Sequence, residues 1–366
     1  METSIFNVSK SDYNVPSLFL GEEMGLVDSI NKHYPKLWSL YKKLKAQDWD
    51  ENEFDLTSCN SDFKTCSKNI YQIMLMTLAW QWEADSIASK TLYSIGAPFI
   101  TSTELNCLWP EITKNELVHA LSYSEIFRNS FDDPNEIIPM VQSMHEAVQR
   151  SELVTEIFNN AYIVSHNLAL GLVDRNSQQA YETIFMFVVA MYFLEKIQFM
   201  ASFAVTFAIA DSGIFVPAGK LIQKIAADEV EIHVEAHKTT LDYELRTERG
   251  LNTFNKLKPR ILELFKAIIE TEKNWINHLF SDDRELTGMD AELLTSWTMF
   301  CAKDPAIFFG FADQFDFPEK NPLGFMAEWL NLDKIQSSPQ EENTGAYLLG
   351  AINRNLGDKK ISAEDL

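Results

Sequence analysis

Two pairs of acidic and histidine residues in this 366-residue chain have the spacing that places both members on one face of a helix. Glu116 and His119 are three residues apart, about −60° around an α-helix, and Glu229 and His233 are four residues apart, about +40°. Carboxylate oxygens and imidazole nitrogens together suit iron or manganese. Each pair is therefore a candidate pair of metal ligands.

Both pairs have simpler interpretations. Thr113 and Glu116 fit a capping box, in which Glu116 only closes the start of a helix. His237 follows His233 by four residues, so Glu229, His233 and His237 could bind one zinc ion, although their order differs from the zinc-protease motif HExxH. A solvated acidic helix face is a further alternative for the second pair.

Two single carboxylates lie in segments that are otherwise apolar. Glu195 is within the apolar run 184–210, and Asp85 is within a stretch rich in Met and Trp. A buried carboxylate must be paired, protonated or bound to a metal. The simpler interpretations are a salt bridge from Glu195 to Lys196, and an exposed helix face that Asp85 shares with Glu83.

The run 184–210 is long enough to cross a membrane, but Glu195, Lys196 and Gln198 lie in its middle. A charged residue at the centre of a bilayer costs roughly 3 kcal/mol or more. A buried helix in a soluble protein is the better interpretation, and we expect no membrane partner.

Together the candidates point to one site. Four helices would each supply a carboxylate, and two of them would also supply a histidine. This is the ligand set of the four-helix di-iron and di-manganese carboxylate proteins. Four carboxylates also balance the charge of two divalent cations.

The composition agrees with long helices. Only 13 Gly and 12 Pro occur in the chain, and few turn-forming residues favour long helices over many short strands. The sequence predicts an all-α protein with helices near residues 62–91, 102–130, 134–171, 177–212, 218–247, 252–281 and 286–310.

Charge and cysteine content exclude other classes. The net charge of −22, from 53 acidic and 31 basic residues, repels phosphate, so we expect no nucleic-acid partner. The four cysteines form no CxxC pair, and the N-terminus has no basic and apolar leader. Reduced thiols and a cytoplasmic location are the expectation.

We expect a single domain over residues 1–335 and a flexible tail over 336–366. The tail is polar apart from a short apolar group, Tyr347-Leu348-Leu349. Such a segment suits a peptide that docks to a partner, and a frayed terminus is the alternative.

At this level of detail the sequence resembles the small, radical-generating subunit of class I ribonucleotide reductase, most like class Ia. The resemblance runs from about residue 15 to the C-terminus. It is carried by the segments WQWEADSIAS, NELVHALSYSEIFRN, FLEKIQFMASFAVTFAIAD, LIQKIAADEVEIH and PQEENTGAYLLG. It implies a ferritin-like four-helix bundle with additional flanking helices, assembled as a homodimer.

The resemblance also implies a ligand set for two metals. Asp85, Glu116 and His119 would bind one metal. Glu195, Glu229 and His233 would bind the other. Two iron ions in a di-iron-oxo centre are the expected cofactor. Manganese or a mixed manganese–iron pair accepts the same ligands, and the sequence does not decide whether an activating flavoprotein is needed.

Tyr123 gains a role from the resemblance. It lies four residues after His119, on the same helical stripe, and corresponds to the tyrosine that the family oxidises to a stable radical. Phe199, Phe203 and Ile225 correspond to the apolar pocket that shelters this radical. Taken alone, Tyr123 would be read as an ordinary core tyrosine.

An exit route for the radical is implied as well. Trp49 and Asp228 correspond to relay residues that are hydrogen-bonded toward His119. Tyr347 corresponds to the tail tyrosine that passes the oxidation to the large catalytic subunit, and the last residues of the tail correspond to the peptide that docks there. A surface-anchoring aromatic is the alternative role for Trp49.

One spacing departs from the family. The second acid–histidine pair is usually three residues apart, whereas Glu229 and His233 are four apart. A π-bulge accommodates one extra residue in a helix and is found at functional sites. We therefore predict a π-type distortion over residues 229–233, with His237 or Glu231 as alternative ligands.

Two other functions are compatible with a similar set of metal ligands. A di-iron oxygenase or oxidase acting on a small apolar substrate would need an open pocket beside the metals. An iron-storage or structural bundle would not need a tyrosine-bearing tail. The chain has neither a GxxxxGK[ST] nor a GxGxxG motif for nucleotides, so ribonucleotide reduction should require the large subunit.

Overall fold

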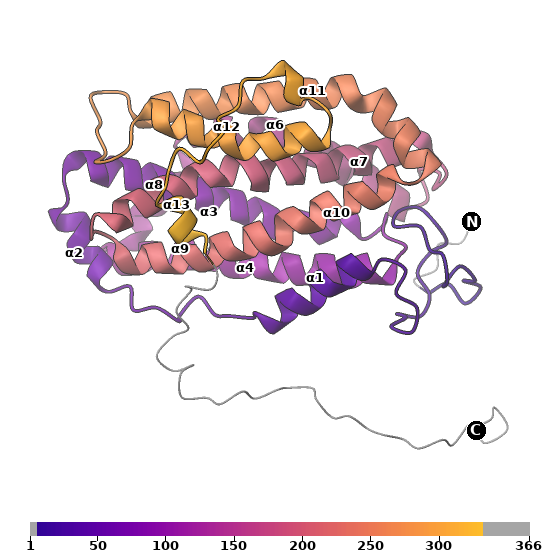
Figure 1. Ribbon diagram of the computed structural model, residues 1–366. Helices are drawn as coiled ribbons and strands as arrows, with labels where there is room; N and C mark the ends of the chain where they lie inside the picture. The colour runs from indigo at the N-terminus through magenta and orange to yellow at the C-terminus, as the bar shows by residue number, and fades with distance from the viewer. Residues whose placement is uncertain (1–5, 332–366) are drawn as a thin grey trace. The chain divides into compact units, whose positions relative to one another are not determined.

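The computed structural model describes residues 6–331, and every regular element in this range is helical (Figure 1). The only β-type pairings there are two isolated bridges. The all-α, ferritin-like class expected from the sequence is confirmed. Residues 336–366, including Tyr347, lie outside the described residues.

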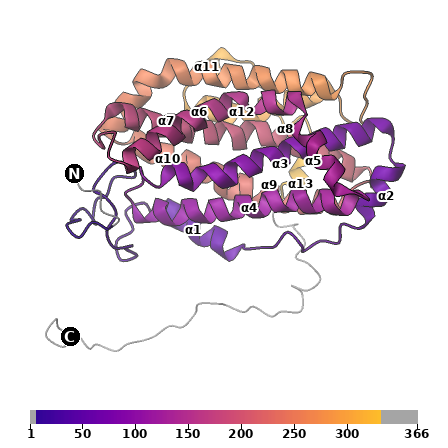
Figure 2. The same cartoon turned by 180° about the vertical axis from the view of Figure 1, so that it is seen from behind.

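Four helical rods form the centre of the bundle. Two are the uninterrupted helices α3 (Lys68–Gly96) and α4 (Thr103–Ser130), which lie side by side in both views (Figures 1 and 2). The third runs through α7 (Gln178–Phe193), η2 (Leu194–Gln198) and α8 (Phe199–Asp211). The fourth runs through α9 (Val216–Asp228), η3 (Glu229–His233) and α10 (Val234–Leu245).

The remaining elements flank these rods. Helices α6 and α12 each pack along α11, all three pack on the third rod, and α1 packs on α4. The flanking elements are α1 (Pro35–Ala46), α2 (Ser58–Thr65), η1 (Pro134–Glu136), α5 (Ile137–Gln142), α6 (His145–Ala169), α11 (Glu248–Leu279), α12 (Ala291–Phe308), η4 (Ala312–Gln314) and α13 (Met326–Trp329).

Serine side chains set the starts of three long helices. Ser67, Ser102 and Ser177 each accept a hydrogen bond from the backbone N–H three residues later, which satisfies an otherwise unpaired donor. Helix α4 therefore begins at Thr103, far upstream of Glu116. The capping-box interpretation of Thr113 and Glu116 is wrong, because the Thr113 hydroxyl donates to the Trp109 carbonyl inside the helix.

Some helix boundaries differ from the sequence prediction. The helix expected over 62–91 is two helices, because Ser67 has extended backbone and caps a new start. The helix expected over 134–171 is likewise broken before His145. Helix α1 was not predicted, since it is short and strongly basic.

Two segments of the central rods are π-helices, Leu194–Gln198 and Glu229–His233. The second confirms the distortion predicted from the departure of the Glu229–His233 spacing from that of the family. The first was not expected. Each segment begins at or near a carboxylate of the expected ligand set, Glu195 or Glu229, which agrees with the general tendency of π-bulges to occur at functional sites.

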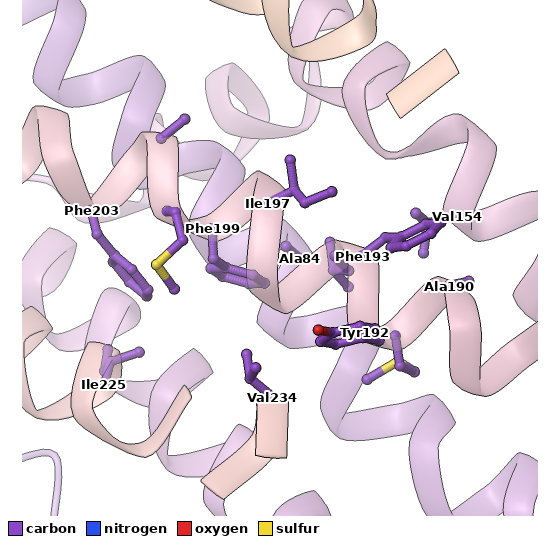
Figure 3. Packing of buried hydrophobic residues seen from close by; sticks show 14 of the residues in the cluster. Ala84, Val154, Ala190, Tyr192, Phe193, Ile197, Phe199, Phe203, Ile225 and Val234 are labelled. Carbon is purple, nitrogen blue, oxygen red and sulfur yellow. The ribbon is translucent and has the colours of Figure 1, made fainter. Parts of the chain in front are cut away.

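One helical stretch among residues 6–331, Gln178–Asp211, is long and apolar enough to cross a membrane. However, 94% of its most apolar window is buried inside the protein. Its apolar side chains face neighbouring helices, as Figure 3 shows for Phe193, Ile197 and Phe199. This stretch is therefore the core helix of the bundle.

A buried ion pair joins the flanking helices to the third rod. The Arg150 guanidinium donates to both carboxylate oxygens of Glu272, at 2.7 and 2.6 Å, and to the Gln198 carbonyl at 2.6 Å. It also lies 3.5 Å from the centre of the Trp80 ring. Arg150 thus links α6 to α11, to the end of the π-helix η2 and to α3.

Replacing Arg150 with Met should destabilise the protein by about 3–5 kcal/mol, because Glu272 would be left as an unpaired buried charge. Urea unfolding of metal-free protein measures this effect. Lys64→Met, which removes the exposed Lys64–Asp132 pair, should leave stability close to that of wild type. Equal stability of the two variants would contradict this role for Arg150.

Candidate metal centre

Four of the predicted ligand residues converge in the core. Glu116 and His119 on α4 and Glu229 and His233 on η3 are all buried, and one ligand atom from each lies within 4.8 Å of the others. The His119 Nδ1 atom is 3.1 Å from Glu229 Oε1, and the His233 Nδ1 atom is 3.1 Å from Glu116 Oε1. Each histidine therefore faces the carboxylate of the other pair.

The two single carboxylates are also buried. Asp85 is 0% exposed and Glu195 is 1% exposed. The exposed-face interpretation of Asp85 is therefore wrong. Lys196 does not pair with Glu195, because its ammonium lies 3.3 Å from Asp304. Instead, Glu195 Oε1 lies 3.1 Å from the Nε2 atom of His237.

The alternative ligands are placed elsewhere. Glu231 is at the edge of the bundle, where it pairs with Lys43 of α1. His237 is buried but is not part of the four-residue cluster. The zinc site of Glu229, His233 and His237 is therefore not assembled in this structure.

The inward-facing atoms fit a pair of metal ions. Buried polar groups in proteins are normally hydrogen-bonded, and each exception needs an explanation. Here the exceptions cluster on the candidate ligands. The buried atoms without a hydrogen-bond partner include Asp85 Oδ1 and Oδ2, Glu116 Oε2, His119 Nδ1, Glu195 Oε2, Glu229 Oε1 and Oε2, and His233 Nδ1. A cationic centre would satisfy all of them.

The pKa shifts of the clustered residues also show that the site favours added positive charge. Burial, together with the charge of Glu116, raises the pKa of Asp85 well above its usual value. Burial and the charge of Glu229 raise the pKa of Glu195 in the same way. Burial alone would lower the pKa of His119 and His233, but the surrounding carboxylates outweigh it and raise both.

A polar network holds the outer nitrogen of each histidine. Asp228 Oδ2 accepts hydrogen bonds from Trp49 Nε1 at 2.6 Å and from Asn115 Nδ2 at 2.9 Å, and it lies 3.3 Å from His119 Nε2. The Asn115 Oδ1 atom lies 2.8 Å from His233 Nε2. Such partners orient a histidine ring, so that its Nδ1 atom faces the centre.

Tyr123 lies in the interior beside this cluster. It is 0% exposed, and its hydroxyl has no hydrogen-bond partner. Burial and then the charges of Asp85, Glu229 and Glu116 raise its pKa well above the usual value. The side chain is therefore a neutral phenol shielded from water.

The three residues of the expected radical pocket are buried in the same apolar core. Phe199 and Phe203 on α8 have ring centres 5.7 Å apart, and Ile225 on α9 lies opposite them in Figure 3. The surroundings they create are apolar, which suits a sheltered radical.

Sequence reasoning missed two features of the site. Asn115 connects the outer partners of the two histidines, but its only signal was its place directly before Glu116. His237 was considered only as a metal ligand, because a sequence pattern does not reveal that its ring faces Glu195.

Comparison with known proteins addresses the family. A family model described as ribonucleotide reductase, small chain, matches residues 28–322. The chain belongs to this family. As a family member it is a subunit of an oxidoreductase.

Named relatives of this small chain cover its full length at low identity. The ribonucleoside-diphosphate reductase subunit beta of Buchnera aphidicola subsp. Schizaphis graminum (strain Sg) is 24% identical over 99% of both chains. The ribonucleoside-diphosphate reductase 1 subunit beta of Escherichia coli O157:H7 is 23% identical over 100% of this chain and 99% of that protein.

Solved structures share the fold. A ribonucleotide reductase R2 subunit from Clostridium botulinum has a TM-score of 0.77, with 18% identity over 91% of this chain and 99% of the other. The dimanganese(II)-NrdF of Streptococcus sanguinis has a TM-score of 0.67, with 16% identity over 83% and 99%.

Metal binding should strengthen as pH rises. Binding must displace protons from His119 and His233, whose pKa values are raised. In metal-free protein, the protonated forms of these histidines add to the free energy of unfolding. This contribution is fully present below their pKa in the unfolded chain, about 6.5. The contribution is lost as the pH rises through their pKa in the folded protein. The increase in thermal unfolding midpoint on adding Mn²⁺ should therefore be larger at about pH 8 than at about pH 6. An equal increase at both pH values would contradict this protonation state.

Proposed function

We propose that this chain is the radical-generating small subunit of ribonucleoside-diphosphate reductase, acting with a large catalytic subunit that reduces ribonucleotides to deoxyribonucleotides. The observation that carries the proposal is the buried set of unpaired carboxylate and imidazole atoms beside Tyr123. Family membership supports the same activity.

Six residues would hold the two metals. Asp85, Glu116 and His119 would bind one ion, and Glu195, Glu229 and His233 would bind the other. We propose two iron ions, and manganese or a mixed manganese–iron pair also fits these oxygen and nitrogen ligands. A bound metal pair supplies the chemistry of dioxygen activation, and with it the oxidising power needed at Tyr123.

Tyr123 would be the residue that is oxidised. Tyr123 would give one electron to the dioxygen-activating centre and its hydroxyl proton to a nearby carboxylate such as Asp85. The neutral phenoxyl radical that remains is short-lived where water and reductants reach it. The complete burial of Tyr123 excludes both, and Phe199, Phe203 and Ile225 would complete the apolar shelter.

The outward route would begin with Trp49. Its indole N–H donates to Asp228, and its ring stacks on His119 with centres 5.8 Å apart and an angle of 25° between the planes. Oxidation of an indole releases its N–H proton, and the hydrogen-bonded carboxylate of Asp228 is placed to accept it. The Trp49–Asp228 hydrogen bond would therefore couple the oxidation of Trp49 to the transfer of its proton.

The partners follow from the same proposal. The tail 336–366 would dock to the large subunit, and Tyr347 would carry the oxidation across. We propose that the small subunit is a homodimer and a cytoplasmic protein. Purified chain without the large subunit should not reduce ribonucleotides.

The oxygenase alternative would need an open pocket at the metals. Asp85, His119, Tyr123, Glu229 and His233 are each 0% exposed. This closed arrangement favours an internal phenol as the oxidised group over a diffusible substrate.

Tyr123→Phe should abolish the tyrosyl signal in electron paramagnetic resonance spectra recorded after loading with iron and oxygen, because phenylalanine has no hydroxyl to oxidise. Tyr192→Phe is the matched control, since Tyr192 is also fully buried and its hydroxyl also has no partner. It should keep the signal. A tyrosyl radical that persists in Tyr123→Phe would assign the radical to another residue.

The Trp49→Phe variant should still form the radical, but it should reduce ribonucleotides with the large subunit at least about a hundredfold more slowly. The reason is that the activation barrier of the oxidation step on this path rises by about 3 kcal/mol or more. Trp297→Phe is the control, since Trp297 is buried and donates only to the Met200 carbonyl. Coupled turnover assays and radical quantification measure both effects. Equal turnover of the two variants would exclude Trp49 from the route.

A further inference from the structure

His237 is the one core histidine that the proposed ligand set does not use. It is 0% exposed and lies on α10, one turn after the π-helix that contains Glu229 and His233. Its ring packs edge-on against Trp109, with centres 6.2 Å apart. Its Nε2 atom lies 3.1 Å from Glu195 Oε1.

The direction of this hydrogen bond follows from the chemistry of the two groups. An ionised carboxylate has only acceptor atoms, so His237 must carry its proton on Nε2 whenever Glu195 is ionised. Its Nδ1 atom is then the unprotonated nitrogen, and it has no partner. A neutral imidazole in this tautomer matches its wholly buried surroundings.

The two oxygens of Glu195 are therefore not equivalent. Oε1 is engaged by His237, whereas Oε2 is buried with no partner. Within residues 6–331, His237 is the only side chain that hydrogen-bonds to this carboxylate. The adjacent ammonium of Lys196 is directed away, to Asp304.

We propose that His237 is a positioning residue that holds Glu195 Oε1 and leaves Oε2 as the single ligand oxygen of this carboxylate. This inference rests on the proposed metal centre and goes beyond it, because it assigns a binding mode to Glu195 and a role to His237. A fixed single-oxygen ligand keeps one more coordination position free on that metal than a two-oxygen ligand would.

Titration of metal-free protein with Mn²⁺ tests the inference. Electron paramagnetic resonance of free Mn²⁺ gives the number of sites and their affinities, and crystal structures of the loaded proteins give the binding mode of Glu195. The variants are His237→Leu, which lacks a donor, and His237→Gln, whose amide N–H can replace Nε2. Thr240→Val is the control, because it removes a buried hydrogen bond to the Ala236 carbonyl in the same helix.

His237→Leu should weaken one of the two Mn²⁺ sites by about 10–100-fold, the usual effect of removing an outer partner of a ligand. Glu195 should then bind through both oxygens or turn away. His237→Gln and Thr240→Val should keep wild-type affinities, with Glu195 bound through Oε2 alone.

Wild-type affinity at both sites in His237→Leu, with Glu195 still bound through one oxygen, would overturn the inference. If His237→Leu does not fold, His237→Asn replaces it, because its shorter amide does not reach Glu195. Equal affinities of His237→Asn and His237→Gln would also overturn the inference. Failure of the wild-type protein to bind a pair of Mn²⁺ ions would instead overturn the proposed metal centre itself.

Discussion

The burial of several carboxylates in an apolar helix bundle is the constraint on which the rest of this structure depends. Asp85, Glu116, Glu195 and Glu229 lie in the core, where isolated charge is strongly unfavourable. His119 and His233 contact Glu116 and Glu229, and His237 contacts one oxygen of Glu195, but several carboxylate oxygens are left without a hydrogen-bond partner. All four carboxyl groups can be ionised together only where positive charge balances them, and a pair of divalent cations would supply that charge.

Long helices place the four carboxylates in the core, and π-helical turns shift the positions of two of them. Helices α3 and α4 are continuous through their proposed ligand residues, whereas Glu195 and Glu229 each lie in a π-helix. A wider turn moves a side chain relative to the rod without breaking it. The buried pair of Arg150 and Glu272 also binds the Gln198 carbonyl at the end of one of these π-helices, three residues after Glu195, and so joins that end to two flanking helices.

The surroundings of the two proposed metals differ in kind. On one side, Asp228 gathers Trp49, Asn115 and His119 into a polar network that leads outward. On the other side, His237 lies within hydrogen-bond distance of Glu195, and its ring packs against that of Trp109. In the proposed function, the first environment would pass a proton and an electron, and the second would orient a ligand. This asymmetry suits a centre that oxidises an internal residue and then delivers the oxidation in one direction.

Residue types and helical spacing were enough to predict the all-α class and the candidate ligands, because periodicity is a local property of the chain. The π-helix at Glu229 was predicted from the resemblance to the family, because only against the family's usual spacing does the extra residue between Glu229 and His233 become visible. The other π-helix, at Glu195, could not be predicted, since no spacing within that helix is unusual. Contacts between helices that are distant in the sequence could not be predicted either. That Glu195 faces His237 and not Lys196, and that Asn115 bridges Asp228 and His233, depends on how the rods are rotated against one another. Packing of the whole bundle sets that rotation, so only the tertiary structure decides it.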